Sequence, residues 1–205
     1  EILENRHPVV EKVLDGEFVA NDIIMDENLL SIDKVDFIED FTVIDIETTG
    51  LSCEKNEIIE LSAIRVRNGI ITDKFSSLVK PNGHINSFIK NLTGISNEMV
   101  ENAPDITSVL PEFMEFISQD VLLGHNISFD LRFIRHNLFK HFKKEFFNQK
   151  LDTMRLSRKY MTHLPSHRLK TVAEYFNVST KGHHRALNDC LITYEIYKNI
   201  KQICS

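Results

Sequence analysis

The clearest pattern of apolar and polar positions in this chain is an alternation centred on residue 45. The segment Phe41–Thr48 is rich in Val, Ile and Thr and ends near a glycine, which predicts a β-strand. Side chains two residues apart on a strand share a face, so Asp45 and Glu47 are expected to point the same way. Ile44 and Ile46 are expected to point the opposite way, into a core.

Two more strands are predicted directly after the first. The apolar run Ile58–Val66 leads to Asn68-Gly69, a dipeptide typical of tight hairpin turns. The segment Ile70–Val79 then returns as a third strand. Three antiparallel strands are therefore expected at the start of the fold.

The remainder of the chain alternates between helical and strand patterns. Ser128 is expected to cap the N-terminus of one helix, and Asp152 to cap another. This order predicts an α/β fold whose mixed sheet, three antiparallel strands and then parallel strands, is flanked by helices. The predicted helices are 85–92, 96–100, 106–118, a helix after 128, 169–176 and 186–203, and the predicted strands are 121–124 and 151–153.

Length and charge indicate one domain with an acidic leader. The 205 residues, 42% of them apolar, suffice for a single full core. The net charge of −6 is uneven: residues 1–40 hold 12 of 30 acids and three of 24 bases, a net −9, so residues 41–205 carry +3. We therefore expect an acidic N-terminal extension, residues 1–40, and a mildly basic domain, residues 41–205. The extension is a candidate arm for docking a partner.

The cysteines and the length of the apolar runs predict where in the cell the protein is found. Cys53, Cys190 and Cys204 are odd in number and lack a Cys-x-x-Cys spacing, which favours a reduced, cytoplasmic protein over a disulfide or zinc framework. No apolar run reaches the roughly 18–20 residues of a membrane span, so no membrane partner is expected. The chain begins with Glu1 instead of Met, which predicts a fragment or a trimmed chain.

The pair Asp45 and Glu47 is the first candidate for chemistry. Two like charges side by side on an apolar strand repel each other and resist desolvation unless a cation lies between them. A divalent metal ion satisfies this requirement. The alternative is a strand end at which both acids reach water or pair with Arg or Lys.

Three further residues complete a candidate set. Asp130 opens a predicted helix, where an acid is also common because it complements the helix dipole. His184 and Asp189 are five residues apart, about 140° on a helix, so both reach one target only if His184 lies in the preceding loop. A histidine there suits a general base near neutral pH. The alternative for His184 is a solvated loop histidine, as expected for His183.

Taken together, the motifs are more specific than any one of them. Asp-x-Glu on an early strand, Asp at the start of a middle helix and His-x4-Asp at the last helix resemble the DEDDh exonucleases of the ribonuclease H-like superfamily. Within it, the pattern is similar to the bacterial DNA polymerase III epsilon and PolC-type exonuclease domains. The likeness covers about residues 41–200. The matching stretches are Val43-Ile-Asp-Ile-Glu-Thr-Thr-Gly-Leu51, Leu92-Thr-Gly-Ile95, Gly124-His-Asn-Ile-Ser-Phe-Asp130, Leu151-Asp-Thr153 and His183-His-Arg-Ala-Leu-Asn-Asp189.

The resemblance implies a reaction and a cofactor. Nucleoside monophosphates would be released from a 3′ end by hydrolysis with two divalent ions, Mg²⁺ or Mn²⁺. Asp45, Glu47 and Asp189 would hold the ion that carries the attacking water, and Asp45 would bridge to the second ion. Asp130 would bind directly or through water, and His184 would take the proton.

The resemblance also implies substrate contacts. Thr48, Thr49 and Gly50 would present polar groups to the terminal nucleotide, and Leu51 and Leu92 would wedge against its base. His125, Asn126 and Phe129 would flank the scissile bond. Core packing is the alternative for Leu51, Leu92 and Phe129, and a backbone-bonded strand end is the alternative for His125. Arg185 is among the cations expected along the path of the strand.

Two alternative hypotheses are compatible with the sequence. The first hypothesis is hydrolysis at the 3′ end of RNA by the same chemistry, although DNA is the favoured substrate. A DNA polymerase subunit is the candidate partner, in replication or repair. A non-catalytic nucleic-acid-binding module would be favoured by the loss of one acid, and none is lost.

Overall fold

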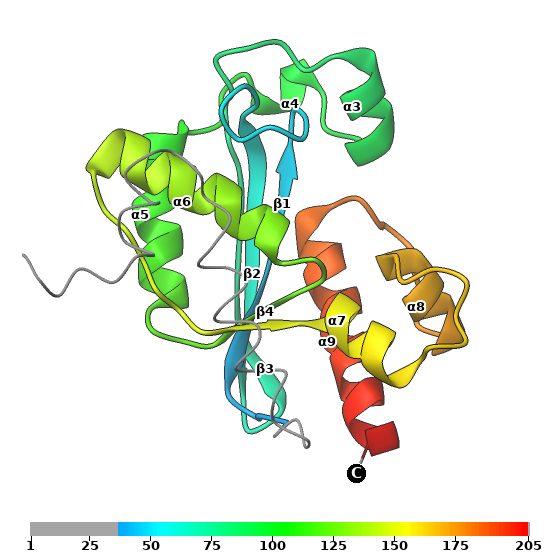
Figure 1. The fold of residues 1–205 in the computed structure, drawn as a ribbon. Helices are drawn as coiled ribbons and strands as arrows, with labels where there is room; N and C mark the ends of the chain where they lie inside the picture. Colours follow the sequence, from blue (N-terminus) through cyan, green and yellow to red (C-terminus); the bar gives the residue numbers. More distant parts are fainter. Residues whose placement is uncertain (1–36, 205) are drawn as a thin grey trace, which may run out of the picture. The chain divides into compact units, whose positions relative to one another are not determined.

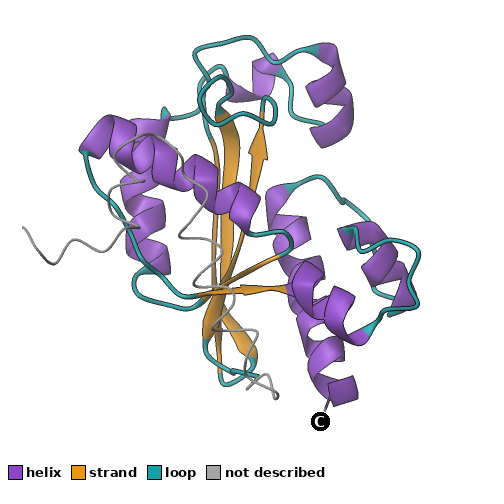
Figure 2. Cartoon of the chain, in the orientation of Figure 1, coloured by secondary structure: helices purple, strands orange, loops and turns teal. Residues whose placement is uncertain are grey.

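The computed structural model of the chain describes residues 37–204 (Figures 1 and 2). The predicted extension 1–40 therefore lies almost wholly outside the described residues and stays a prediction. Five strands are described: β1 Phe41–Thr48, β2 Ile58–Arg67, β3 Ile70–Leu78, β4 Leu122–Gly124 and β5 Lys150–Asp152. The helices are α3 Ser87–Thr93, α4 Asn97–Val100, α5 Ile106–Ile117, α6 Ser128–Phe142, α7 Thr153–Tyr160, α8 Leu169–Tyr175 and α9 Ala186–Cys204.

The sheet has the mixed order that the sequence predicted. Its strands lie in the order β3-β2-β1-β4-β5. The β1–β2 and β2–β3 pairs are antiparallel, and the β1–β4 and β4–β5 pairs are parallel. At the β2–β3 turn, Asn68 and Gly69 have φ values of 51° and 71°, the left-handed geometry that a two-residue hairpin turn requires. The α/β fold prediction is confirmed.

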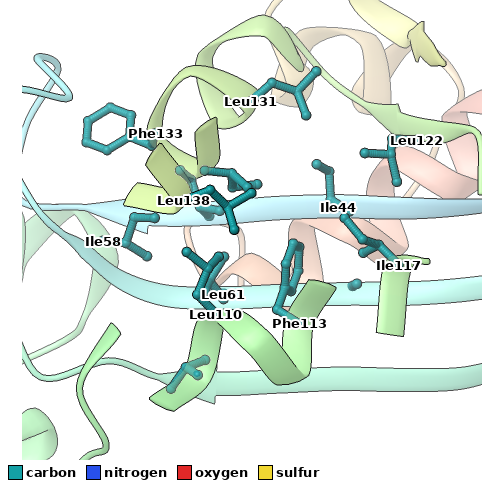
Figure 3. Packing of buried hydrophobic residues seen from close by; sticks show 14 of the residues in the cluster. Ile44, Ile58, Leu61, Leu110, Phe113, Ile117, Leu122, Leu131, Phe133 and Leu138 are labelled. Carbon is teal, nitrogen blue, oxygen red and sulfur yellow. The ribbon is translucent and has the colours of Figure 1, made fainter. Parts of the chain in front are cut away.

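Helices cover both faces of the sheet. Helices α5 and α6 pack on one face, and α9, supported by α7 and α8, packs on the other (Figure 1). Ile44, Leu61 and Phe113 are at most 1% exposed in the cluster between the sheet and α5 and α6 (Figure 3). Burial of one such side chain stabilises the fold by about 1.5–3 kcal/mol. The alternation along β1 thus faces Ile44 into this core and Asp45 toward α9.

The start of α6 corrects one expectation. Ser128 is the first residue of the helix and not its cap: Ile127 precedes it in a helical conformation, without a side-chain capping bond. The reason is a tight turn, because Asn126 adopts a left-handed φ of 64° directly before Ile127. By contrast, Asp152 caps α7 as expected, with its side chain accepting a hydrogen bond from the Met154 N–H.

None of the helices within residues 37–204 combines the length and the apolar character that crossing a bilayer requires.

Candidate active site

Two strands supply adjacent acids to the face beneath α9. Asp45 and Glu47 project from β1 on the side opposite Ile44 and Ile46, as predicted. Across the antiparallel pair, Glu47 lies opposite Glu60 of β2. Three carboxylates therefore gather on one face near the end of β1.

The last helix adds a further acid to this group. Asp189 lies in the first turn of α9 and is 5% exposed. One carboxylate oxygen from each of Asp45, Glu47 and Asp189 lies within 4.8 Å of the others. The structure thus brings three of the four predicted acids to a common point.

Asp130 takes a different place from these three. It lies in the first turn of α6, 5% exposed, and its Oδ1 accepts a hydrogen bond from the Ile46 N–H at 3.1 Å. It is close enough for its charge to raise the pKa of Asp45. Among the described residues, however, it lies outside the group of oxygens within 4.8 Å. Asp130 therefore borders the site while holding the backbone of β1.

The carboxyl groups of the site have raised pKa values, because they are buried close together with little positive charge nearby. Burial, reinforced by the charges of Asp130 and Asp189, raises the pKa of Asp45 well above its usual range. Burial likewise raises the pKa of Glu47 to about 8, against a lowering by Arg185, and that of Asp130 to about 8. A cluster of hard oxygen donors that lacks counter-charge fits divalent metal ions.

His184 occupies the loop before α9, as its spacing predicted. Its φ of 71° turns the chain, and its backbone N–H donates to Asp189 Oδ2 at 3.2 Å. Burial, together with the adjacent His183, lowers the pKa of the His184 ring. The ring is therefore neutral near pH 7 and able to accept a proton.

The prediction of a solvated His183 is wrong. Its Nδ1 lies 2.7 Å from Asp189 Oδ1, and its side chain is only 19% exposed. Positive φ values at Gly182 and His184 fold the loop back, which stacks the two imidazoles with their centroids 3.8 Å apart. The sequence signal was only the adjacency of two histidines, which does not say which ring faces the acids.

The last residue of β1 and the loop that follows it hold the first predicted substrate contacts. Thr48 Oγ1 donates to the Gly50 carbonyl at 2.7 Å, and Thr49 Oγ1 accepts from the Glu57 N–H at 2.9 Å. A Cβ on Gly50 would lie 2.6 Å from the Asn56 side chain, so a larger residue would displace Asn56, which accepts a hydrogen bond from the Ser52 N–H at 3.0 Å. Both threonine hydroxyls thus shape the loop in this structure.

The three apolar residues predicted to contact the substrate differ in how far they are exposed to solvent. Leu51 is 81% exposed and Leu92 is 42% exposed, so the core-packing alternative is wrong for both. Phe129 instead packs against the core cluster, with its ring 5.1 Å from that of Phe133. Two apolar side chains are therefore displayed to solvent in the segments expected to meet a base.

His125 is a histidine at a strand end whose ring contacts a backbone carbonyl, which was the alternative to a substrate contact. Its Nε2 lies 2.8 Å from the His167 carbonyl oxygen, and its Nδ1 lies 2.9 Å from Thr153 Oγ1. Asn126 is exposed at the turn, and its N–H donates to Asp152. Both ring nitrogens of His125 are thus engaged inside the protein.

The sequence is similar to known proteins over most of its length. Residues 42–197 match the RNase_T family, described as exonuclease. This chain belongs to that exonuclease family. The exonuclease is 46% identical to DNA polymerase III subunit epsilon of Aquifex aeolicus over 160 residues, 78% of this chain and 79% of that protein. The exonuclease fold implies divalent metal ions.

Another relative and two solved structures are also similar to this chain. The exonuclease is 45% identical to the PolC-type DNA polymerase III of Caldanaerobacter subterraneus over 158 residues, 77% of this chain but only 11% of that protein. It superposes on exonuclease X in complex with 5′ overhanging duplex DNA with a TM-score of 0.65 at 27% identity, covering 79% of this chain and 91% of that one. E. coli exonuclease I in complex with a dT13 oligonucleotide, at 18% identity, shares the fold (TM-score 0.72; 80% and 41% covered).

The raised carboxyl pKa values predict how the metal-free exonuclease responds to pH. Between pH 6.5 and 8 the native acids hold protons that unfolded acids, with pKa values near 4, have released. The native state binds more protons, so the free energy of unfolding should fall as pH rises, by about 3 kcal/mol. Histidines with lowered pKa values oppose this decline only near its lower edge, where their unfolded forms, with a pKa near 6.5, still release protons.

Thermal unfolding in EDTA at pH 6.5, 7.25 and 8 measures this effect. Asp45→Asn should flatten the decline, and excess Mg²⁺ should restore stability at pH 8, because the ion binds the native state. A melting temperature that is constant or rises over this range in the wild-type protein contradicts the prediction.

Proposed function

We propose that this domain is a Mg²⁺- or Mn²⁺-dependent 3′–5′ exonuclease that releases nucleoside monophosphates from the 3′ end of single-stranded or frayed DNA. The observation that carries the proposal is the convergence of Asp45, Glu47 and Asp189 oxygens within 4.8 Å, beside His184. Hydrolysis of a phosphodiester at such a cluster requires a base for water and charge stabilisation for the phosphate.

Each residue has a separate task in this proposal. Asp45, Glu47 and Asp189 would hold the metal ions, and Asp130 would support them from the start of α6. When bound, a pair of divalent ions stabilises the attacking and leaving oxygens of an in-line displacement. The neutral ring of His184 would remove the proton from the attacking water, and Asp189 would orient the loop that carries this ring.

The choice of DNA is supported by the names of the relatives and solved structures, whereas the exposed side chains fit either nucleic acid. Exonuclease X and exonuclease I were solved with DNA, and the two sequence relatives are named as DNA polymerase III proteins. Leu51 and Leu92 are exposed apolar surfaces on which a terminal base can stack, a contact that does not depend on base identity. A DNA polymerase is the partner that this assignment implies, and a cytoplasmic location stays a prediction.

Digestion of end-labelled oligonucleotides tests the direction, the metal and the sugar together. With Mg²⁺ or Mn²⁺, 5′-labelled single-stranded DNA should give a ladder that shortens one nucleotide at a time, and 3′-labelled DNA should release labelled mononucleotide at once. RNA of the same sequence should be cut more slowly. Preference for RNA would transfer the proposal to an exoribonuclease, and inactivity on both would contradict it.

A further inference from the structure

An ion pair between the buried Glu60 and the partly exposed Arg185 lies beside the carboxylate cluster and has no task in the proposed hydrolysis. Glu60 of β2 is 2% exposed. Arg185 Nη2 donates to Glu60 Oε1 at 2.7 Å, and Arg185 Nε lies 3.3 and 3.2 Å from the two carboxylate oxygens. The sequence prediction placed Arg185 among cations along the nucleic-acid path; the structure pairs it with Glu60.

Glu60 also holds the end of a helix. The N–H of Ala186, the first residue of α9, donates to Glu60 Oε2 at 2.9 Å. A carboxylate at a helix N-terminus satisfies a free N–H group and complements the helix dipole. Both oxygens of Glu60 are thus bonded to α9 and its preceding loop, so this acid is not free to bind an ion.

The segment that Glu60 holds is the one that carries the functional residues of α9. Arg185 directly follows His184, and its carbonyl accepts the Asp189 N–H at 3.0 Å. Asp189 Oδ2 in turn accepts the His184 N–H. Glu60 is therefore connected through one or two hydrogen bonds to both His184 and Asp189, while its own strand is paired with the strand of Asp45 and Glu47.

We propose that Glu60 is a positioning residue that fixes the His184–Asp189 segment against the acids of β1 by binding Arg185 and the Ala186 N–H. The inference rests on the proposed function, since positioning is meaningful only if His184 and Asp189 take part in hydrolysis. Loops place side chains less accurately than strands and helices, and reacting groups must be held within about 0.5 Å. The two-point ion pair gives the His184 loop this accuracy.

Glu60→Gln tests the role, because glutamine keeps the size and can accept the Ala186 N–H but loses the charge that holds Arg185. We expect kcat on 5′-labelled DNA to fall about 10- to 100-fold, with KM within threefold. In a His184→Ala background, the same change should cost less than threefold, because the residue being positioned is gone. An equal loss in both backgrounds, or no loss in the first, overturns the proposal.

Arg185→Lys removes the two-point contact from the more exposed partner, because lysine lacks the guanidinium group. This variant replaces Glu60→Gln as the test if Glu60→Gln does not fold. It should show the same dependence on His184, and independence would overturn the proposal. Asp73→Asn is the matched control, because it removes a different ion pair of the same strand. Arg65, like Glu60, belongs to β2, and its Nη1 lies 3.2 Å from Asp73 Oδ2. The kcat of Asp73→Asn should equal that of the wild type, and a similar loss there would show a general effect of ion pairs on the sheet.

A measurement without turnover separates this inference from the proposed function. In the metal-free protein, NMR should detect the ring proton of His183 in its hydrogen bond to Asp189 in the wild type and in Asp73→Asn. We expect this signal to broaden or disappear in Glu60→Gln and in Arg185→Lys. An unchanged signal in both overturns the positioning role, whereas an inactive wild-type enzyme with the expected signals overturns only the proposed function.

Discussion

Asp45→Asn should reduce hydrolysis of single-stranded DNA by about 10³- to 10⁵-fold while the protein stays folded. The change removes one charge from the centre of the cluster and preserves the shape of the side chain. A loss of this size corresponds to roughly 4–7 kcal/mol of transition-state stabilisation, as expected when a residue that would hold the metal ions is neutralised. Because Asp45 is buried among like charges, the metal-free variant should also be more stable than the wild type at pH 8.

The assay is initial velocity with Mg²⁺ on 5′-labelled DNA, alongside circular dichroism and thermal unfolding. Asp73→Asn provides the control, since it makes the same chemical change at a half-exposed acid of β3. Asp189→Asn should behave like Asp45→Asn in velocity. Normal turnover by a well-folded Asp45→Asn protein would refute the metal assignment.

His184→Ala should slow hydrolysis by about 10²- to 10⁴-fold, the usual contribution of a general base. The wild-type rate should fall as pH drops through the lowered pKa of His184, because only the neutral ring accepts a proton. The variant should lack this decline, since it has no ring to protonate. A pH–rate profile from pH 5 to 8.5, at saturating Mg²⁺, measures both effects.

His183→Ala identifies which of the two stacked rings is the base. His183 contacts Asp189 Oδ1, so its loss should weaken divalent-ion affinity and lower the rate by no more than about tenfold. Titration calorimetry with Mn²⁺ gives the affinity directly. If the large loss and the missing pH dependence instead appear in His183→Ala, the roles of the two rings are exchanged.

Much of the fold follows from local patterns. The period of two along β1 correctly placed Asp45 and Glu47 on one face and Ile44 on the other, because burial of one face determines the register of a strand. The hairpin turn at Asn68-Gly69 followed from backbone conformations that few residues adopt. Those signals lie within a few residues of the feature that they predict.

The site depended on signals that no local pattern contains. The convergence of β1 with α9 was expected from a family resemblance and not from spacing. Glu60 gave no signal, because its partner Arg185 is 125 positions away and a glutamate in a strand is ordinarily exposed. The exposure of Leu51 and Leu92 was undecided for the same reason, since burial depends on which segments cover a side chain.

The carboxylate cluster unites β1, the first strand described, with α9, the last helix. Translation proceeds from the N-terminus, so the acids of β1 leave the ribosome long before Asp189 does. A nascent chain that ends before residue 184 has the sheet but lacks both His184 and the Asp189 carboxylate. The carboxylate cluster should therefore form only after α9 has been synthesised and has packed on the sheet.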